Sequence, residues 1–260
     1  MLIQIIAGTF LAGVVSVWLA WMLCRSFLTR HPQHMLSLAA GALLATAFIN
    51  LLPEAFDSDY SAKSLFLIFF LGLLTVIVLD NAEVLHRAHV LGLPSGHQRT
   101  PHEHISSAPT GRWAVLFGGG VHAFADGILI ASAFLANEKL GWGAAFAVLL
   151  HEVPHHLSDL AVVGNGGSKP RKAVLKVTLA GSFTMAGGLA GYLIVGQLAG
   201  WLPMLLVLAA SSFAYVALSD IIPQLNRPKG LRQTIVQLSC LLFGSLLVSA
   251  AVMVAGGHGH

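Results

Sequence analysis

Two stretches of this 260-residue sequence place histidines and carboxylates at helical spacing. The first contains His122 and Asp126, and the second, residues 151–159, contains five such groups: His151, Glu152, His155, His156 and Asp159. At about 100° per residue, a helix would gather these five side chains into a stripe covering less than half of its circumference. Imidazole nitrogens and carboxylate oxygens suit tetrahedral Zn²⁺, and mixed N/O sites also accept Fe²⁺ and Mn²⁺. The two stretches therefore predict a divalent metal site.

Both stretches lie inside long apolar runs, in a chain that is 56% hydrophobic and 10% charged with a mean hydropathy of +0.78. Soluble domains carry about 25% charged residues, so this composition excludes a soluble enzyme, a disordered protein and a nucleic-acid binder. A helical bilayer crossing needs about 20 mostly apolar residues. Eight such runs hold 180 of the 260 residues: Leu2–Leu23, Met35–Phe56, Ser64–Leu85, Trp113–Ala136, Trp142–Val163, Ala173–Val195, Trp201–Ile222 and Gln233–Ala255. Because lipid requires every backbone polar group to be satisfied internally, we expect an all-α polytopic membrane protein with eight transmembrane helices and a single domain over residues 1–260.

The loop charges orient these spans. Twelve of the 14 Lys and Arg residues fall in loops on one side, and only Lys63 and Lys139 fall on the other. The positive-inside rule then places both termini outside, and the pI of about 9.1 becomes a topology signal that needs no nucleic acid as partner. The longest loop, about residues 87–112, is expected in the cytosol and contains four histidines: His89, His97, His102 and His104. It is either a solvated linker or a weak metal-collecting segment.

The metal-ligand stretches lie in the fourth and fifth predicted spans, which a short loop joins. Such helices should pack antiparallel, so we expect His122, Asp126, His151 and His155 to meet near the bilayer midplane, with Glu152 beside them. The competing interpretation is a hydrogen-bonded network that only joins two helices. Seven ionisable groups exceed what helix association requires, and ionisable groups inside a membrane are functional candidates by default.

A short internal similarity relates the second and seventh spans. Asn50-Leu-Leu-Pro53-Glu54 resembles Asp220-Ile-Ile-Pro223-Gln224 at an offset of 170 residues. The charge-derived topology runs these two spans in opposite directions. This predicts an inverted repeat of spans one to three and six to eight flanking spans four and five, as in many transporters. Asn50 and Asp220 are then candidates for lining a pathway.

The same residues resemble the ZIP (ZRT/IRT-like) family of metal transporters. The segment from His122 to Gly127 resembles the family's fourth-helix motif His-Asn-Phe-x-Asp-Gly, and residues 151–159 resemble its fifth-helix motif His-Glu-Ile-Pro-His-Glu-x-x-Asp. Residues 51–55 and 213–220 resemble the family's second and seventh helices.

The resemblance implies a zinc transporter in the cell membrane that moves metal into the cytosol, with Fe²⁺, Mn²⁺, Cd²⁺ or Co²⁺ as other possible cargo. It implies a main site made by four ligands, with Glu152 bridging or neighbouring: His122, Asp126, His151 and His155. It makes His156 and Asp159 secondary or pathway groups, and it implies a homodimer. Two departures, Ala123 in place of the motif Asn and His156 in place of the motif Glu, together with a sixth span lacking acidic residues, favour a single-metal centre.

An enzyme is the chief rival function. His151-Glu152-x-x-His155 matches the zincin motif, in which the Glu is the general base, so an intramembrane zinc metalloprotease could use it. His122 and Asp126 would, however, fill coordination that a catalytic zinc leaves open for water. We therefore expect a transporter and no enzyme. A metal sensor that binds without transport is the third possibility.

Overall fold

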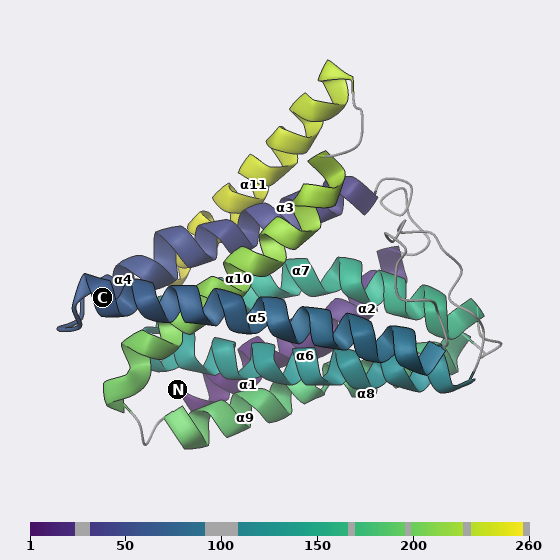
Figure 1. The fold of residues 1–260 in the computed structure, drawn as a ribbon, viewed down its shortest axis with the longest axis horizontal. Coiled ribbons are helices and arrows are strands. Elements are labelled where there is room, and N and C mark those ends of the chain that lie inside the picture. The colour runs from purple at the N-terminus through teal and green to yellow at the C-terminus, as the bar shows by residue number, and fades with distance from the viewer. Residues whose placement is uncertain (24–31, 92–108, 166–169, 196–198, 226–229, 257–260) are drawn as a thin grey trace.

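The computed structural model describes residues 1–23, 32–91, 109–165, 170–195, 199–225 and 230–256, and these fold into helices without a strand among them (Figure 1). Within these ranges, six helical stretches are long and apolar enough to cross a membrane: Leu2–Leu23, Gln33–Phe56, Ala62–Leu79, Arg171–Val195, Leu202–Ser219 and Leu231–Val254. The protein is thus an all-α polytopic membrane protein, as the composition predicts.

The other two predicted spans correspond to α6 (Pro109–Ala136) and α7 (Glu138–Asn165), each of 28 residues. By composition, the apolar part of α6 is the shorter stretch Gly120–Ala136, and α7 does not qualify among the described residues. For α7 the reason lies in the sequence, because its histidines and carboxylates lower its hydropathy, whereas in α6 the side chains of residues 109–119 lie outside the described set.

The first two predicted spans each contain a π-helical turn. Their elements are α1 (Leu2–Phe10), η1 (Leu11–Val15) and α2 (Ser16–Leu23) in one rod, and α3 (Pro32–Ala45), η3 (Thr46–Leu51) and α4 (Leu52–Phe56) in the other. Single π-helical turns within α-helices are frequent at functional sites. In the first rod, the Ser16 hydroxyl donates to the Gly13 carbonyl at 3.0 Å, which satisfies a backbone group at the irregular turn.

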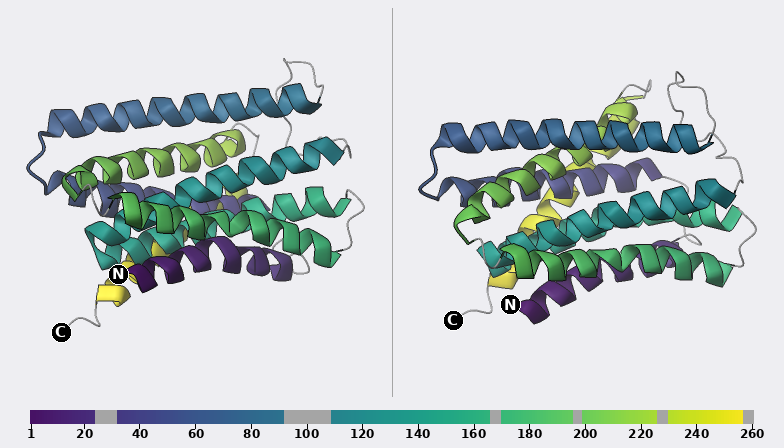
Figure 2. Two further views of the ribbon diagram at one scale, coloured as in Figure 1. Left: turned by 90° about the horizontal axis from the view of Figure 1, so that it is seen from below. Right: turned by 60° about the horizontal axis from the view of Figure 1, so that its bottom comes forward.

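The remaining helices complete the bundle. They are α5 (Ala62–Leu91), α8 (Pro170–Gly181), α9 (Phe183–Val195), α10 (Leu202–Leu225), which follows the short 3₁₀ turn η4 (Ala199–Trp201), and α11 (Leu231–Gly256). One turn at Ser182 separates α8 from α9, and the Ser182 hydroxyl donates to the Leu179 carbonyl there. As Figure 2 shows, α11 ends at the same end of the bundle at which α1 begins.

Helix α7 lies at the centre of the bundle, in contact with α2, α3, α6 and α11, whereas α6 packs on α9 (Figure 1). Glycines bring α6 and α9 unusually close. A Cβ atom on Gly127 would collide with the backbone of Thr184, and one on Gly187 would collide with the backbone of Phe124. Small residues that allow such backbone approach are typical of helix pairs in membranes. The residue next to Asp126 therefore fixes α6 against its neighbour.

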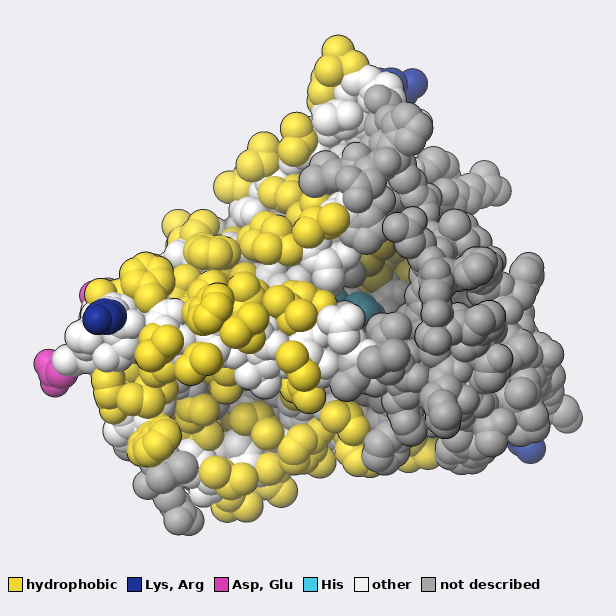
Figure 3. Space-filling view, viewed as in Figure 1, with side chains coloured by type: hydrophobic (Ala, Val, Ile, Leu, Met, Phe, Trp, Pro, Cys, Tyr) yellow, Lys and Arg dark blue, Asp and Glu magenta, His cyan; other side chains and the backbone are white. Residues whose placement is uncertain are grey.

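Apolar side chains cover most of the described part of the face in Figure 3, where the described Lys, Arg, Asp and Glu side chains lie toward the ends of the helices. Large exposed apolar residues on α5 and α11 include Phe66, Phe70, Leu242 and Leu246. Such a surface suits contact with lipid tails.

The long loop is shorter than the sequence predicts. Its expected bounds were residues 87 and 112, but α5 continues to Leu91 and α6 already begins at Pro109. Hydropathy marks only the part of a helix that lies in lipid, whereas intrahelical hydrogen bonding extends the helix beyond that part. Residues 92–108, with His97, His102 and His104, lie outside the described residues, as does the side chain of His89.

Candidate metal centre

Helix α6 supplies one imidazole and one carboxylate to a point between α6 and α7. His122 and Asp126 are one helical turn apart, and His122 Nε2 lies 3.6 Å from Asp126 Oδ2. Asp126 is buried, at 5% exposure, whereas the His122 side chain keeps 37% of its surface accessible. Asp126 Oδ2 accepts no hydrogen bond from the described residues.

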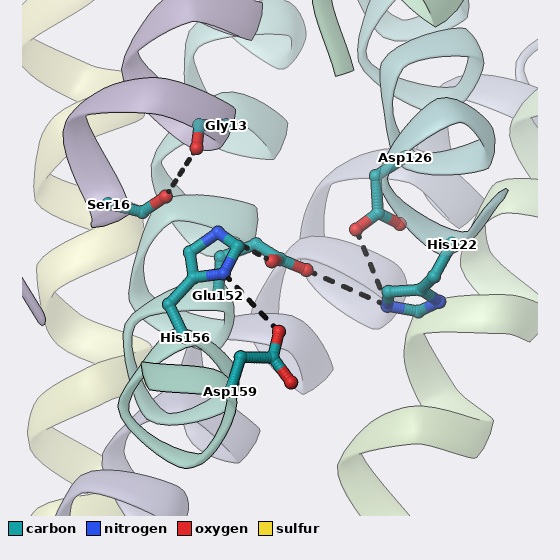
Figure 4. Close-up of polar contacts among 7 residues, drawn as sticks. All are labelled: Gly13, Ser16, His122, Asp126, Glu152, His156 and Asp159. Carbon is teal, nitrogen blue, oxygen red and sulfur yellow. Dashed lines mark hydrogen bonds and ion pairs between the residues drawn. The ribbon is translucent and has the colours of Figure 1, made fainter. Parts of the chain in front are cut away.

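Helix α7 faces this pair with His151 and Glu152, both of which are buried. Glu152 Oε1 lies 3.7 Å from His122 Nε2, and it too accepts no hydrogen bond within the described part of the chain. His122, His151 and Glu152 each direct one ligand atom into a cluster in which all atoms lie within 4.8 Å of one another. The structure thus brings together the two stretches that the sequence singles out (Figure 4).

The separations around His122 Nε2 fit a shared cation better than direct hydrogen bonds. Protein hydrogen bonds between N and O span about 2.7–3.2 Å, and both contacts are longer. Ligand atoms that surround a tetrahedral Zn²⁺ at about 2.0–2.2 Å lie about 3.4 Å from one another. A cation between the two buried carboxylate oxygens would also offset the cost of burying their charges near one imidazole nitrogen. The donor set and its spacing therefore fit a small divalent metal.

His155 lies at the edge of this cluster. Its ring centroid is 4.4 Å from that of His151 and 6.0 Å from that of His122, with the latter pair stacked. Unlike the other four groups that the sequence predicts for the main site, His155 is exposed. It is therefore adjacent to the buried cluster but borders the accessible side.

His156 and Asp159 lie on the other side of Glu152. His156 Nε2 is 3.2 Å from Glu152 Oε2, and His156 Nδ1 is 3.8 Å from Asp159 Oδ2. In Figure 4 the glutamate lies between the two imidazoles of His156 and His122. The imidazole of His156 is buried between two carboxylates and does not join the His122 cluster.

The sequence analysis missed the contribution of the first span. The Gly13 carbonyl of the π-helical turn lies beside the His156 ring, and the Ser16 hydroxyl donates to the same carbonyl (Figure 4). Neither residue is ionisable, so a search for metal ligands does not find them. The only signal is a glycine and a serine three positions apart in an otherwise apolar run.

Asn50 and Asp220, the two predicted pathway residues, belong to other helices than the clustered side chains. Asn50 lies in η3, with its side-chain Nδ2 near Gly143 of α7, and Asp220 lies in α10, where its side chain is outside the described set. Ala123, which replaces the motif Asn, is buried at 2% exposure and offers no ligand atom.

The chain is similar to known zinc transporters. The family model described as ZIP Zinc transporter matches residues 81–251. The chain is 33% identical to Zinc transporter foi of Drosophila melanogaster over 133 residues and 35% identical to Zinc transporter ZIP6 of Homo sapiens over 136 residues, in each case over 51% of this chain. These matches cover only 19% and 18% of those relatives.

A longer alignment exists with Zinc transporter ZIP13 of Pongo abelii, which is 26% identical over 264 residues, covering 94% of this chain and 74% of the relative. The family match spans both α6 and α7 with all the clustered side chains. From its sequence, its helices and its matches, the chain belongs to the ZIP zinc transporter family.

Proposed function

We propose that this protein transports zinc, or a similar divalent transition metal, across the membrane through the site between α6 and α7. The observation that carries the proposal is the cluster of His122, His151 and Glu152, whose ligand atoms lie within 4.8 Å of one another on two membrane helices. Asp126 and His155 border the cluster and complete the proposed ligand set. Zinc as cargo is supported by the family and by a donor set of imidazoles and carboxylates.

The proposed direction is into the cytosol. The positive-inside distribution of Lys and Arg supports a topology with both termini outside. An inside-negative potential then contributes about 2.3 kcal/mol per charge per 100 mV, or about twice that for a divalent ion. The His122 side chain keeps 37% of its surface accessible while Glu152 is buried, so the cluster lies next to an accessible part of α6.

We further propose that the fold is an inverted repeat of spans one to three and six to eight. The contacts between helices support it, because the repeat relates α3 to α10, α5 to α11 and α6 to α7. The contact of α3 with α11 then corresponds to that of α10 with α5, and the contact of α3 with α7 corresponds to that of α10 with α6. The close approach of the first and sixth spans also supports this repeat. A Cβ atom on Gly13 would meet the Gly181 carbonyl, and one on Gly181 would meet the Gly13 carbonyl. Reciprocal contacts of this kind are expected on a two-fold axis that exchanges the repeats.

A flux assay tests the transport proposal. The purified protein in liposomes is given Zn²⁺, Mn²⁺, Fe²⁺ or Cd²⁺ outside, with and without a pH gradient and a membrane potential. Zinc uptake is expected for the wild type and is expected to be lost in His122→Ala and His151→Ala. Ser132→Ala is the matched control, because Ser132 is a buried polar residue of α6 whose hydroxyl donates to the Ile128 carbonyl of its own helix. Wild-type uptake in both histidine variants would refute this site.

The protease alternative has no support from the family, whose members are transporters. In the site, His122 and Asp126 approach Glu152 from α6, in the space that a catalytic water and a substrate would need. Cleavage of a membrane substrate that depends on Glu152, in the absence of flux, would reverse this conclusion. Metal binding without flux would instead support a sensor.

On the family resemblance alone, we also propose a homodimer in the cell membrane. The mass of the protein in detergent micelles, measured by light scattering with the detergent subtracted, tests the oligomeric state. Fractionation of membranes from expressing cells tests the location.

A further inference from the structure

The two carboxylate oxygens of Glu152 have different surroundings. Oε1 faces α6, where it lies 3.7 Å from His122 Nε2 and accepts no hydrogen bond from the described residues. Oε2 faces the other way and lies 3.2 Å from His156 Nε2. Figure 4 shows the carboxylate aligned between the two imidazoles. One oxygen is thus directed to the candidate metal centre, whereas the other lies within ion-pair distance of His156.

His156 is itself held in place. It is 4% exposed, its Nδ1 lies 3.8 Å from Asp159 Oδ2, and its ring lies beside the Gly13 carbonyl of the π-helical turn in the first span. The Ser16 hydroxyl fixes that carbonyl from within the same span. The orientation of Glu152 is therefore determined from outside the metal cluster, by α7 and by the first span together.

We propose that His156 is a positioning residue that keeps Glu152 a single-oxygen ligand and thereby favours Zn²⁺ over larger ions that prefer more oxygen ligands. This inference rests on the metal site proposed above. Zn²⁺ is usually satisfied by four ligand atoms, so a single oxygen from Glu152 is enough for it. Mn²⁺ prefers octahedral, oxygen-rich surroundings, so a second oxygen from the same carboxylate is worth more to it. As long as Oε2 is engaged by His156, that second oxygen is withheld.

His156 is less well placed to hold a second metal ion. Its two ring nitrogens face different carboxylates, Nε2 toward Glu152 and Nδ1 toward Asp159. A metal bound at one nitrogen would have one of these carboxylates on the opposite side of the ring. Polar partners that orient a ligating carboxylate from outside the coordination shell have this arrangement.

The test compares His156→Gln with His156→Met. Both side chains are unbranched and similar in length, but only Gln retains an N–H group that can engage Oε2. Zn²⁺ and Mn²⁺ affinities are measured on each purified protein in detergent by competition with a metal indicator. X-ray absorption of the metal-loaded proteins counts the oxygen ligands. Changes in such outer partners usually cost about 10- to 100-fold in metal affinity.

In His156→Met we expect zinc affinity to fall about 10-fold or more and manganese affinity to fall less or rise, with one more oxygen ligand around Mn²⁺. His156→Gln should keep the wild-type ratio of the two affinities. Equal losses for both ions in the Met variant, or an altered ratio in a folded Gln variant, would overturn the inference. If the Met variant does not fold, the ratio in the Gln variant decides alone. Failure of wild-type flux would overturn only the proposed transport, because the affinity ratio is measured without flux.

Discussion

His122 Nε2 on α6 and Glu152 Oε1 on α7 lie 3.7 Å apart across the interface between the two helices. This separation is too long for a hydrogen bond and close to the distance between two ligands of one zinc ion. It joins two sequence motifs that are about 30 residues apart into one centre. Several expected outcomes depend on this relationship and on the helix packing that maintains it.

The first prediction is a non-additive double mutant. His122→Ala and Glu152→Gln should each lower the zinc affinity of the purified protein by more than about 100-fold, since even outer-shell changes cost about 10- to 100-fold. The loss of zinc affinity in the double variant should be much smaller than the product of the two single losses. Both side chains would bind the same ion, so removing either one already disables the site. Isothermal titration with zinc measures all three. Additive losses would mean that the two residues act on separate ions.

The second prediction concerns charge in the centre. Asp126 Oδ2 and Glu152 Oε1 are buried near the same nitrogen, His122 Nε2. Asp126→Asn removes one of these buried charges, so the metal-free protein should unfold at a higher temperature than the wild type. Its stabilisation by zinc should shrink by about 1.4 kcal/mol for each tenfold loss of affinity. Thermal unfolding in detergent measures the midpoint of the metal-free variant in chelator and its stabilisation by excess zinc. A lower midpoint in chelator would contradict the account.

The third prediction tests the close packing of α6 on α9. A Cβ on Gly127 would collide with the Thr184 backbone, so Gly127→Ala should destabilise the protein by about 1–3 kcal/mol, as overpacking usually does. Gly120→Ala on the same helix is the control, because its Cβ would lie 3.7 Å from the Phe183 ring, an ordinary contact. Thermal unfolding and zinc affinity are measured for both variants. Equal effects would show that close packing at Gly127 is not what positions Asp126.

The fourth prediction is the sidedness of the chain. After Cys24 and Cys240 are replaced by Ser, single cysteines are introduced at four exposed basic positions: Lys63, Lys139, Arg171 and Arg232. A membrane-impermeant maleimide added to intact cells should label the first two and reach the last two only after the cells are opened. The reverse pattern would invert the proposed topology and with it the proposed direction of transport.

Much of the fold could be read from the sequence because lipid leaves few choices. The run Leu2–Leu23 predicts the first rod with its observed bounds, since an apolar segment of that length in lipid must satisfy its backbone as a helix. Composition predicts eight spans, and six helical stretches within the described residues are long and apolar enough to cross a membrane. The histidines and carboxylates of α7 recur at helical periodicity, which predicted the polar stripe on that helix.

The sequence by itself determined the helical class, six of the candidate membrane spans and the residue types of the candidate metal centre, because apolar length and 3.6-residue periodicity are local properties of the chain. Only the tertiary structure decided which oxygen of Glu152 faces His122 and which faces His156. It also decided that Gly13 and Ser16 of the first span lie behind the site, and that His155 remains at its exposed edge. These relationships depend on how the first span, α6 and α7 pack against one another, and packing between helices leaves no local pattern in the sequence.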